Sequence, residues 1–219
     1  MFSALFVVLV VGASVAYALR LPLVVEGDGV GAWLGLALIH AVLAGIGVYR
    51  LQRQGRLSAL VRVRPGDLSI GIALALLLAI SSWALARWLI PVASVERAWL
   101  LRIALVLGQS SSSTATIGLV ALAVCEELVW RGWVQTELGL RLGARGWMLS
   151  ALLYAVAHAA TLVTLRDSVA GPNPLLFLGA LGCGLCWAFL RERSGRLFPG
   201  IVSHAAFTYL ATQYLWRFI

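Results

Sequence analysis

Two adjacent carboxylates and an arginine interrupt one of the most apolar parts of this chain. They lie in "CEELVWRG", Cys125–Gly132, which follows the nine uncharged residues "TIGLVALAV". Residues four apart are neighbours on a helix surface, so Glu127 and Arg131 are predicted to pair. Successive helical residues differ by about 100° around the axis, so Glu126 points elsewhere and is left for another role. A purely structural Glu127–Arg131 pair remains an open alternative.

Histidines occur in three other apolar segments. His158 lies in "YAVAHAA", one turn after Tyr154, and His204 lies in "IVSHAAFTY", one turn before Thr208. A carboxylate and an imidazole in a partly dry cavity can take a proton from water, and a second histidine and a hydroxyl can donate hydrogen bonds to a developing oxyanion. These groups suffice for water-mediated peptide hydrolysis. His40, in "ALIHAVL", is interpreted instead as a structural helix–helix hydrogen bond.

The composition predicts that these groups lie inside a membrane. The chain has 219 residues, of which 61% are hydrophobic and 12% charged, with a mean hydropathy of +0.94. Soluble domains carry roughly twice that charged fraction. An ionisable side chain fully exposed to lipid costs about 2.5–3.5 kcal/mol on insertion scales, so each one inside the membrane is by default a functional hypothesis. The net charge of +8 comes entirely from arginine rather than lysine. Because these arginines cluster in short loops, we predict a bilayer and not nucleic acid as the partner.

The apolar runs predict an all-α, polytopic helical bundle with seven to eight transmembrane segments, folded as a single membrane domain over residues 1–219. A weaker eighth run, Trp99–Gly108, is short and contains Arg102, so we expect it to be interfacial or re-entrant. The seven stronger runs, each near the roughly 20 residues that span a bilayer, are 2–19, 29–49, 68–90, 114–136, 146–165, 174–190 and 197–216.

Three arginine-rich loops set the expected orientation. They are "YRLQRQGRLSALVRVRPGD", "LRLGARG" and "RERSGR". Such loops favour the cytoplasmic side, and all three share one side only if Trp99–Gly108 does not cross. The N-terminus is then cytoplasmic and the C-terminus external. Ala16-Tyr17-Ala18 resembles a signal-peptide cleavage site, but no positive charge precedes the apolar run, so we predict that residues 1–18 are retained.

Cysteine usage adds no further chemistry at this stage. Cys125, Cys183 and Cys186 all lie in apolar segments and indicate no disulfide framework. The last two form a C-x-x-C flanked by "GALGCG". Small residues of this kind allow close helix packing, which we prefer to metal or redox use.

At these residues the sequence resembles the CAAX-type prenyl endopeptidases and their bacterial relatives, the CPBP (or ABI) intramembrane proteases. The E-E-x-x-x-R motif appears as Glu126-Glu127-Leu-Val-Trp-Arg131, and an aromatic residue with x-x-x-H appears as Tyr154-Ala-Val-Ala-His158. The stretch "RSGRLFPGIVSHAAF" is similar to the loop and final histidine helix of the family. The resemblance covers about residues 114–210, which would be the catalytic core.

The resemblance implies a glutamic-type intramembrane endopeptidase that cleaves near the C-terminus of a membrane-associated substrate, in a prokaryotic cytoplasmic membrane. Glu126 and His158 would activate water, and His204 and Thr208 would polarise the scissile carbonyl. Glu127 and Arg131 would orient the site. We expect no cofactor. The alternative within enzymes is a zinc ion held by Glu126, His158 and His204.

One position departs from the family pattern and keeps a second class of function open. The last motif is usually H-x-x-x-N, and Thr208 replaces the asparagine here. Either a hydroxyl serves in the oxyanion site, or this chain is a noncatalytic scaffold, an immunity factor or another partner-binding protein on the same fold. A transporter is a weaker alternative because no repeated halves are visible.

Overall fold

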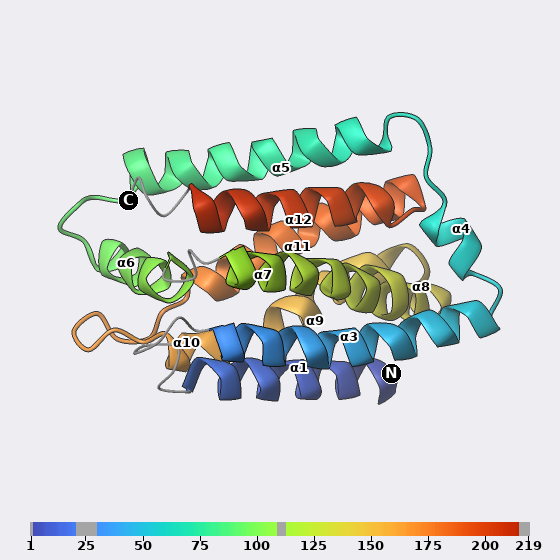
Figure 1. Cartoon of the computed structure of the whole chain (residues 1–219), viewed down its shortest axis with the longest axis horizontal. Coiled ribbons are helices and arrows are strands. Elements are labelled where there is room, and N and C mark those ends of the chain that lie inside the picture. Colours follow the sequence, from blue (N-terminus) through green and yellow to red (C-terminus); the bar gives the residue numbers. More distant parts are fainter. Residues whose placement is uncertain (1, 21–29, 109–112, 215–219) are drawn as a thin grey trace.

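The computed structural model describes residues 2–20, 30–108 and 113–214, and these residues form a bundle of helices that run roughly parallel and antiparallel to one another (Figure 1). Within the described ranges no β-strand occurs, apart from an isolated bridge between Asp167 and Gly171. The predicted all-α class is therefore confirmed. The elements, in chain order, are α1 (Phe2–Arg20), α3 (Val30–Arg53), α4 (Leu57–Val61), α5 (Asp67–Ala84), η1 (Leu85–Leu89), α6 (Val95–Gly108), α7 (Ser113–Glu126), η2 (Glu127–Val134), α8 (Gln135–Leu142), η3 (Gly143–Arg145), α9 (Gly146–Ala157), α10 (Thr161–Thr164), α11 (Leu175–Ser194) and α12 (Phe198–Gln213).

The outward faces of the bundle are apolar. Leu9, Leu77 and Trp88 are examples, and 71%, 60% and 69% of their respective residue surfaces are exposed. A helix that is apolar on its outer as well as its inner face suits a lipid surrounding. Together with the hydropathy of the helices, this identifies the chain as an integral membrane protein.

The predicted count of seven to eight spans is not confirmed. Four described stretches are long and apolar enough to cross a bilayer: Leu34–Arg53, Asp67–Leu89, Thr116–Thr164 and Leu175–Ser194. The third contains two of the predicted segments, and it reverses direction after α8 (Figure 1). The first predicted segment corresponds to a shorter apolar helix, and the last corresponds to α12, which has only 16 residues.

The N-terminal helix is part of the packed core. Val7, Val11 and Val15 of α1 are buried in the same hydrophobic cluster as residues of α3, α7 and α9. Their spacing of four places them on one face of the helix. Retention of residues 1–18 in the mature protein stays a prediction.

The three arginine-rich junctions lie at one end of the bundle, and α6 lies at the other end (Figure 1). Arg196, after α11, donates to Asp67 at the start of α5 with Nη2 2.6 Å from Oδ1. This hydrogen bond raises the pKa of the Arg196 guanidinium. At the opposite end, Trp99 Nε1 of α6 donates to the carbonyl oxygen of Ala170 at 3.2 Å. As the sequence predicts, α6 does not carry the chain from one end of the bundle to the other. Which end is cytoplasmic stays a prediction.

Cysteine labelling in intact vesicles tests this topology. In a chain whose native cysteines are replaced by alanine, Q54C and A144C lie in exposed arginine-rich junctions, and S168C lies in the exposed loop beyond α10. We expect an impermeant maleimide to label the first two from the cytoplasmic face and S168C from the other face. Labelling of Q54C and A144C from different faces would show that α6 spans the bilayer.

Candidate functional site

Glu126 is the last residue of α7, and its carboxylate faces a cavity of about 500 Å³ within the bundle. The wall is mostly apolar and comes from α5, η1, α6, α7, α9, α11 and α12. Five polar residues of the wall come from the predicted motifs, and they are Glu126, Tyr154, His158, His204 and Thr208. The structure therefore brings together residues that lie up to 82 positions apart in the chain, counted from Glu126 to Thr208.

The E-E-x-x-x-R motif lies where α-helix gives way to π-helix. The sequence predicts a regular helix over 114–136, but Glu127–Val134 forms the π-helical segment η2. A π-helix uses i→i+5 hydrogen bonds and is frequent at functional sites; here Gln135 N–H donates to the carbonyl oxygen of Trp130. The same carbonyl accepts a hydrogen bond from Ser150 Oγ of α9 at 3.2 Å. This contact attaches the π-helical segment to α9, which ends immediately before His158.

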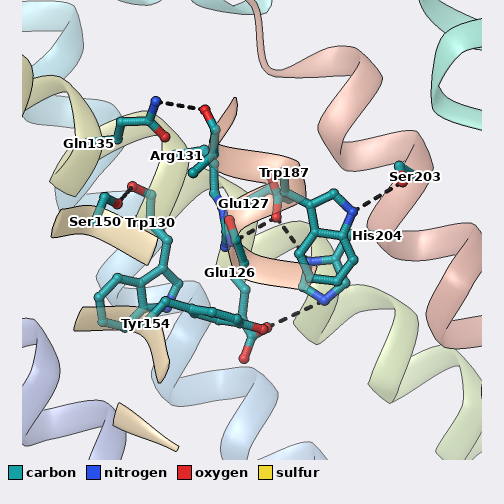
Figure 2. A network of polar contacts seen from close by, with 12 residues as sticks. Glu126, Glu127, Trp130, Arg131, Gln135, Ser150, Tyr154, Trp187, Ser203 and His204 are labelled. Atoms are coloured by element: carbon teal, nitrogen blue, oxygen red, sulfur yellow. Dashed lines mark hydrogen bonds and ion pairs between the residues drawn. The ribbon is translucent and has the colours of Figure 1, made fainter. Parts of the chain in front are cut away.

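Glu127 and Arg131 form the predicted ion pair, and both side chains are completely enclosed (Figure 2). Arg131 Nη1 lies 3.3 Å from Glu127 Oε1, and Arg131 Nη2 donates to the carbonyl oxygen of Gly184 at 3.1 Å. The guanidinium also lies over the Tyr154 ring, with Cζ 4.4 Å from the centroid. The pair is confirmed, and its cation–π contact and backbone hydrogen bond connect η2 to α9 and α11.

His204 lies between the two carboxylates. Its Nδ1 is 3.0 Å from Glu127 Oε1, and its Nε2 is 3.6 Å from Glu126 Oε2. The ring stacks on Trp187, with centroids 3.7 Å apart and planes 19° apart, and Trp187 Nε1 donates to Ser203 Oγ at 3.1 Å. The stacking and the Glu127 contact hold the imidazole plane, so Nε2 points toward Glu126 and the cavity (Figure 2).

Tyr154 of α9 and His158, the residue that follows α9, both lie close to Glu126. The Tyr154 hydroxyl donates to Glu126 Oε2 at 2.9 Å. His158 Nδ1 is 2.9 Å from the carbonyl oxygen of Tyr154, and its Nε2 is 3.9 Å from Glu126 Oε1. A carbonyl oxygen can only accept, so Nδ1 carries the hydrogen and a neutral His158 presents an unprotonated Nε2 to the carboxylate. The sequence places Tyr154 in the motif but does not predict its hydrogen bond to Glu126.

His40 lies closer to the predicted site than its sequence interpretation as a structural histidine indicates. Its hydrogen bond is not to another helix but to its own, with Nδ1 2.8 Å from the carbonyl oxygen of Leu36. Its Nε2 lies 3.7 Å from Glu126 Oε1. The chain contains three histidines, and all three therefore face Glu126. No local pattern could have identified His40, because only the packing of α3 against α7 and η2 brings it to the site.

Two glycines make room for the polar cluster. A Cβ atom at Gly184 of α11 would lie 2.9 Å from Cδ1 of Tyr154, and one at Gly200 of α12 would lie 2.9 Å from Oε2 of Glu127. Real Cβ atoms essentially never come that close, so a side chain at either position would force Tyr154 or Glu127 to move. The predicted packing role of the "GALGCG" segment is confirmed at Gly184. All three cysteines are free thiols.

Possible metal ligands gather around Glu126 but do not form a metal-binding arrangement. Among residues 2–20, 30–108 and 113–214, no three His, Cys, Asp or Glu side chains are placed to hold a metal ion together. The proposed zinc ligands Glu126, His158 and His204 do come together in space, with His158 Nε2 3.9 Å from Glu126 Oε1 and His204 Nε2 3.6 Å from Glu126 Oε2.

Comparison of the sequence with models of known protein families shows to which family this chain belongs. The model of the type II CAAX prenyl endopeptidase Rce1-like family matches residues 98–210, which is more than half of the chain. The chain belongs to the Rce1-like family. Searches of curated proteins and of solved structures gave no match. The Rce1-like segment begins within α6, so it includes every residue of the predicted site, whereas His40 on α3 lies outside it.

Proposed function

We propose that this protein is an intramembrane endopeptidase that hydrolyses a peptide bond near the C-terminus of a membrane-associated protein, through a water molecule activated by Glu126 and His158. The observation that carries the proposal is the convergence of Glu126, His158 and His204 on one mostly apolar cavity. The chain's membership of a prenyl endopeptidase family supports the reaction class and a membrane-associated protein as substrate. A prokaryotic cytoplasmic membrane with a cytoplasmic N-terminus is part of the proposal.

The gap between Glu126 and His158 suits a bound water. Glu126 Oε1 and His158 Nε2 are 3.9 Å apart, which is beyond direct hydrogen bonding but within reach of a water that donates one hydrogen to each. Such a water would direct its lone pair into the cavity, toward the carbonyl carbon of a bound peptide. Glu126 takes the water proton as the oxygen–carbon bond forms. It returns a proton to the amine nitrogen when the carbon–nitrogen bond breaks.

The His204 imidazole is suited to the oxyanion of the tetrahedral intermediate. Glu127 Oε1 accepts a hydrogen bond from His204 Nδ1 and stabilises a positively charged ring, as a carboxylate behind a catalytic histidine does elsewhere. A protonated Nε2 can then donate to the oxyanion, with the Thr208 hydroxyl as the second donor. Arg131 holds Glu127 in position for this contact.

We propose a reaction without a metal ion. The carboxylate and imidazoles supply a base and an oxyanion donor, so the scheme is complete in protons and electron pairs without a Lewis acid. A noncatalytic scaffold remains the second candidate, because Thr208 stands in place of the usual asparagine of the family.

Substitution of the two adjacent glutamates separates the base from the structural pair. We expect E126Q to abolish cleavage of a C-terminal peptide by purified protein, while the detergent melting temperature stays near that of wild type. We expect E127Q to lower both, because Arg131 loses its carboxylate partner; breaking a buried ion pair costs about 3–5 kcal/mol. Wild-type turnover in E126Q would refute the assignment of Glu126 as base.

Substitution of Thr208 tests whether its hydroxyl is an oxyanion donor. T208V keeps the shape of the side chain and removes the hydroxyl, so we expect kcat to fall while KM is unchanged. A single oxyanion donor is worth about 2.7–4 kcal/mol in well-studied sites, and we expect a smaller loss because a rotating hydroxyl is less well fixed. T208N should retain or raise kcat. Cleavage by T208V at the wild-type rate would leave His204 as the oxyanion donor without Thr208.

Chelation tests the absence of a metal. We expect activity to survive exhaustive treatment with a strong chelator, and elemental analysis to find less than one zinc per chain. Activity that chelation removes and added zinc restores would instead favour zinc at Glu126, His158 and His204.

A further inference from the structure

We propose that His40 is a positioning residue for the catalytic carboxylate: its unprotonated Nε2 accepts a hydrogen bond from Glu126 Oε1 when that oxygen carries the proton taken from water. The proposal rests on the proposed function for its catalytic use. It adds to the site a residue of α3, which lies outside the segment that matches the Rce1-like family.

The tautomer of His40 follows from its anchor. Nδ1 lies 2.8 Å from the carbonyl oxygen of Leu36, and that oxygen can only accept. Nδ1 therefore carries a hydrogen, and a neutral ring has its lone pair on Nε2. The side chain is fully buried, so no solvent can hydrogen-bond to Nε2 from outside.

Nε2 of His40 has no hydrogen-bond partner in the part of the chain that the structure describes. A buried acceptor without a donor costs about 1–3 kcal/mol. The ionisable group against it is Glu126, whose Oε1 lies 3.7 Å away and is also an acceptor while the carboxylate is charged. Both atoms are satisfied when one proton lies between them, and that proton arrives when Glu126 acts as base. Catalytic hydrogen bonds are often long before substrate binds and then tighten.

The two oxygens of Glu126 are consequently different. Oε2 accepts the Tyr154 hydroxyl at 2.9 Å, which favours negative charge on that oxygen. Oε1 faces two imidazole Nε2 atoms, those of His40 at 3.7 Å and His158 at 3.9 Å. Oε1 is thus the oxygen that takes the proton. His158 lines the cavity and is available to water, whereas His40 is not among the cavity-lining residues and contacts Glu126 alone among the reacting groups.

An interaction of this kind contributes to the rate because it forms only after proton transfer. Contacts that are stronger in the transition state than in the resting state accelerate a reaction. The resting enzyme has two facing acceptors at this position, and the protonated intermediate has a donor and an acceptor. His40 therefore favours proton uptake by Glu126 without touching the substrate.

Nitrogen-15 NMR of histidine-labelled protein tests the contact without any activity. The chain gives only three imidazoles, and the His40 signals are assigned by their loss in H40Q. At neutral pH we expect a protonated Nδ1 and an unprotonated Nε2. In E126Q the Tyr154 hydroxyl donates to the amide oxygen of the new glutamine, so the amide NH₂ group faces His40. The Nε2 signal of His40 should then shift because Nε2 accepts a hydrogen bond.

E127Q, the matched control, should shift the His204 signals instead. A His40 protonated on both nitrogens, or an Nε2 signal that does not respond to E126Q, would overturn the proposal.

Two substitutions of His40 test its use in catalysis. H40Q keeps an acceptor near the position of Nε2 and loses the Leu36 anchor. H40N keeps a donor near Nδ1 for Leu36 and loses the acceptor. If the acceptor matters, we expect H40Q to cleave peptide at least about tenfold faster than H40N, the effect of losing roughly one buried hydrogen bond. Equal rates, or a faster H40N, would show that His40 only anchors α3. If wild-type protein cleaves no peptide, the proposed function fails, and the NMR result still decides whether His40 accepts from residue 126.

Discussion

A pair of carboxylates enclosed in an apolar bundle is the constraint on which the rest of this structure depends. A buried charge is tolerated only when it is paired and hydrogen-bonded. Arg131 compensates Glu127 at 3.3 Å and thereby leaves the charge of Glu126 to be balanced by other groups. The Tyr154 hydroxyl and His204 Nε2 lie against Oε2, while His40 and His158 face Oε1 and become hydrogen-bond partners once that oxygen carries a proton. The polar residues of five different elements, α3, α7, η2, α9 and α12, are thus explained by the need to stabilise two adjacent side chains.

The helix packing follows from the same requirement. The cluster can form only if backbones approach closely, and Gly184 and Gly200 allow α11 and α12 to lie against Tyr154 and Glu127. The π-helical segment η2 widens the helix where both Glu127 and Arg131 turn inward. Aromatic rings complete the enclosure, because Trp187 stacks on His204 and Tyr154 lies under Arg131. Each of these contacts excludes water from the ion pair and strengthens it.

The sequence predicts the ingredients of the site better than their arrangement. The spacing of Glu127 and Arg131 predicts their pairing because i,i+4 contacts are local. The two histidines of the motifs could be identified because ionisable groups are costly inside a membrane. The π-helix, by contrast, could not be predicted. It differs from an α-helix only in that its hydrogen bonds join residues five apart rather than four apart, and the hydropathy of the sequence does not reveal this difference. His40 could not be identified because its neighbour Glu126 is 86 positions away, and nothing in "ALIHAVL" indicates which helix lies beside it.

The position of His40 also bears on how the chain is organised. The motif-containing region, 98–210, contains the proposed base, the proposed oxyanion donors and the ion pair. A catalytic core made of this region alone would leave Oε1 of Glu126 facing only His158. With α3 packed on α7 and η2, a residue from the first quarter of the chain lies 3.7 Å from that oxygen. Because α1 in turn packs against α3 and α9, the placement of His40 depends on the N-terminal helices as a unit. The first hundred residues therefore do more than anchor the site in the bilayer, since they provide one of the polar surfaces against which its carboxylate is held.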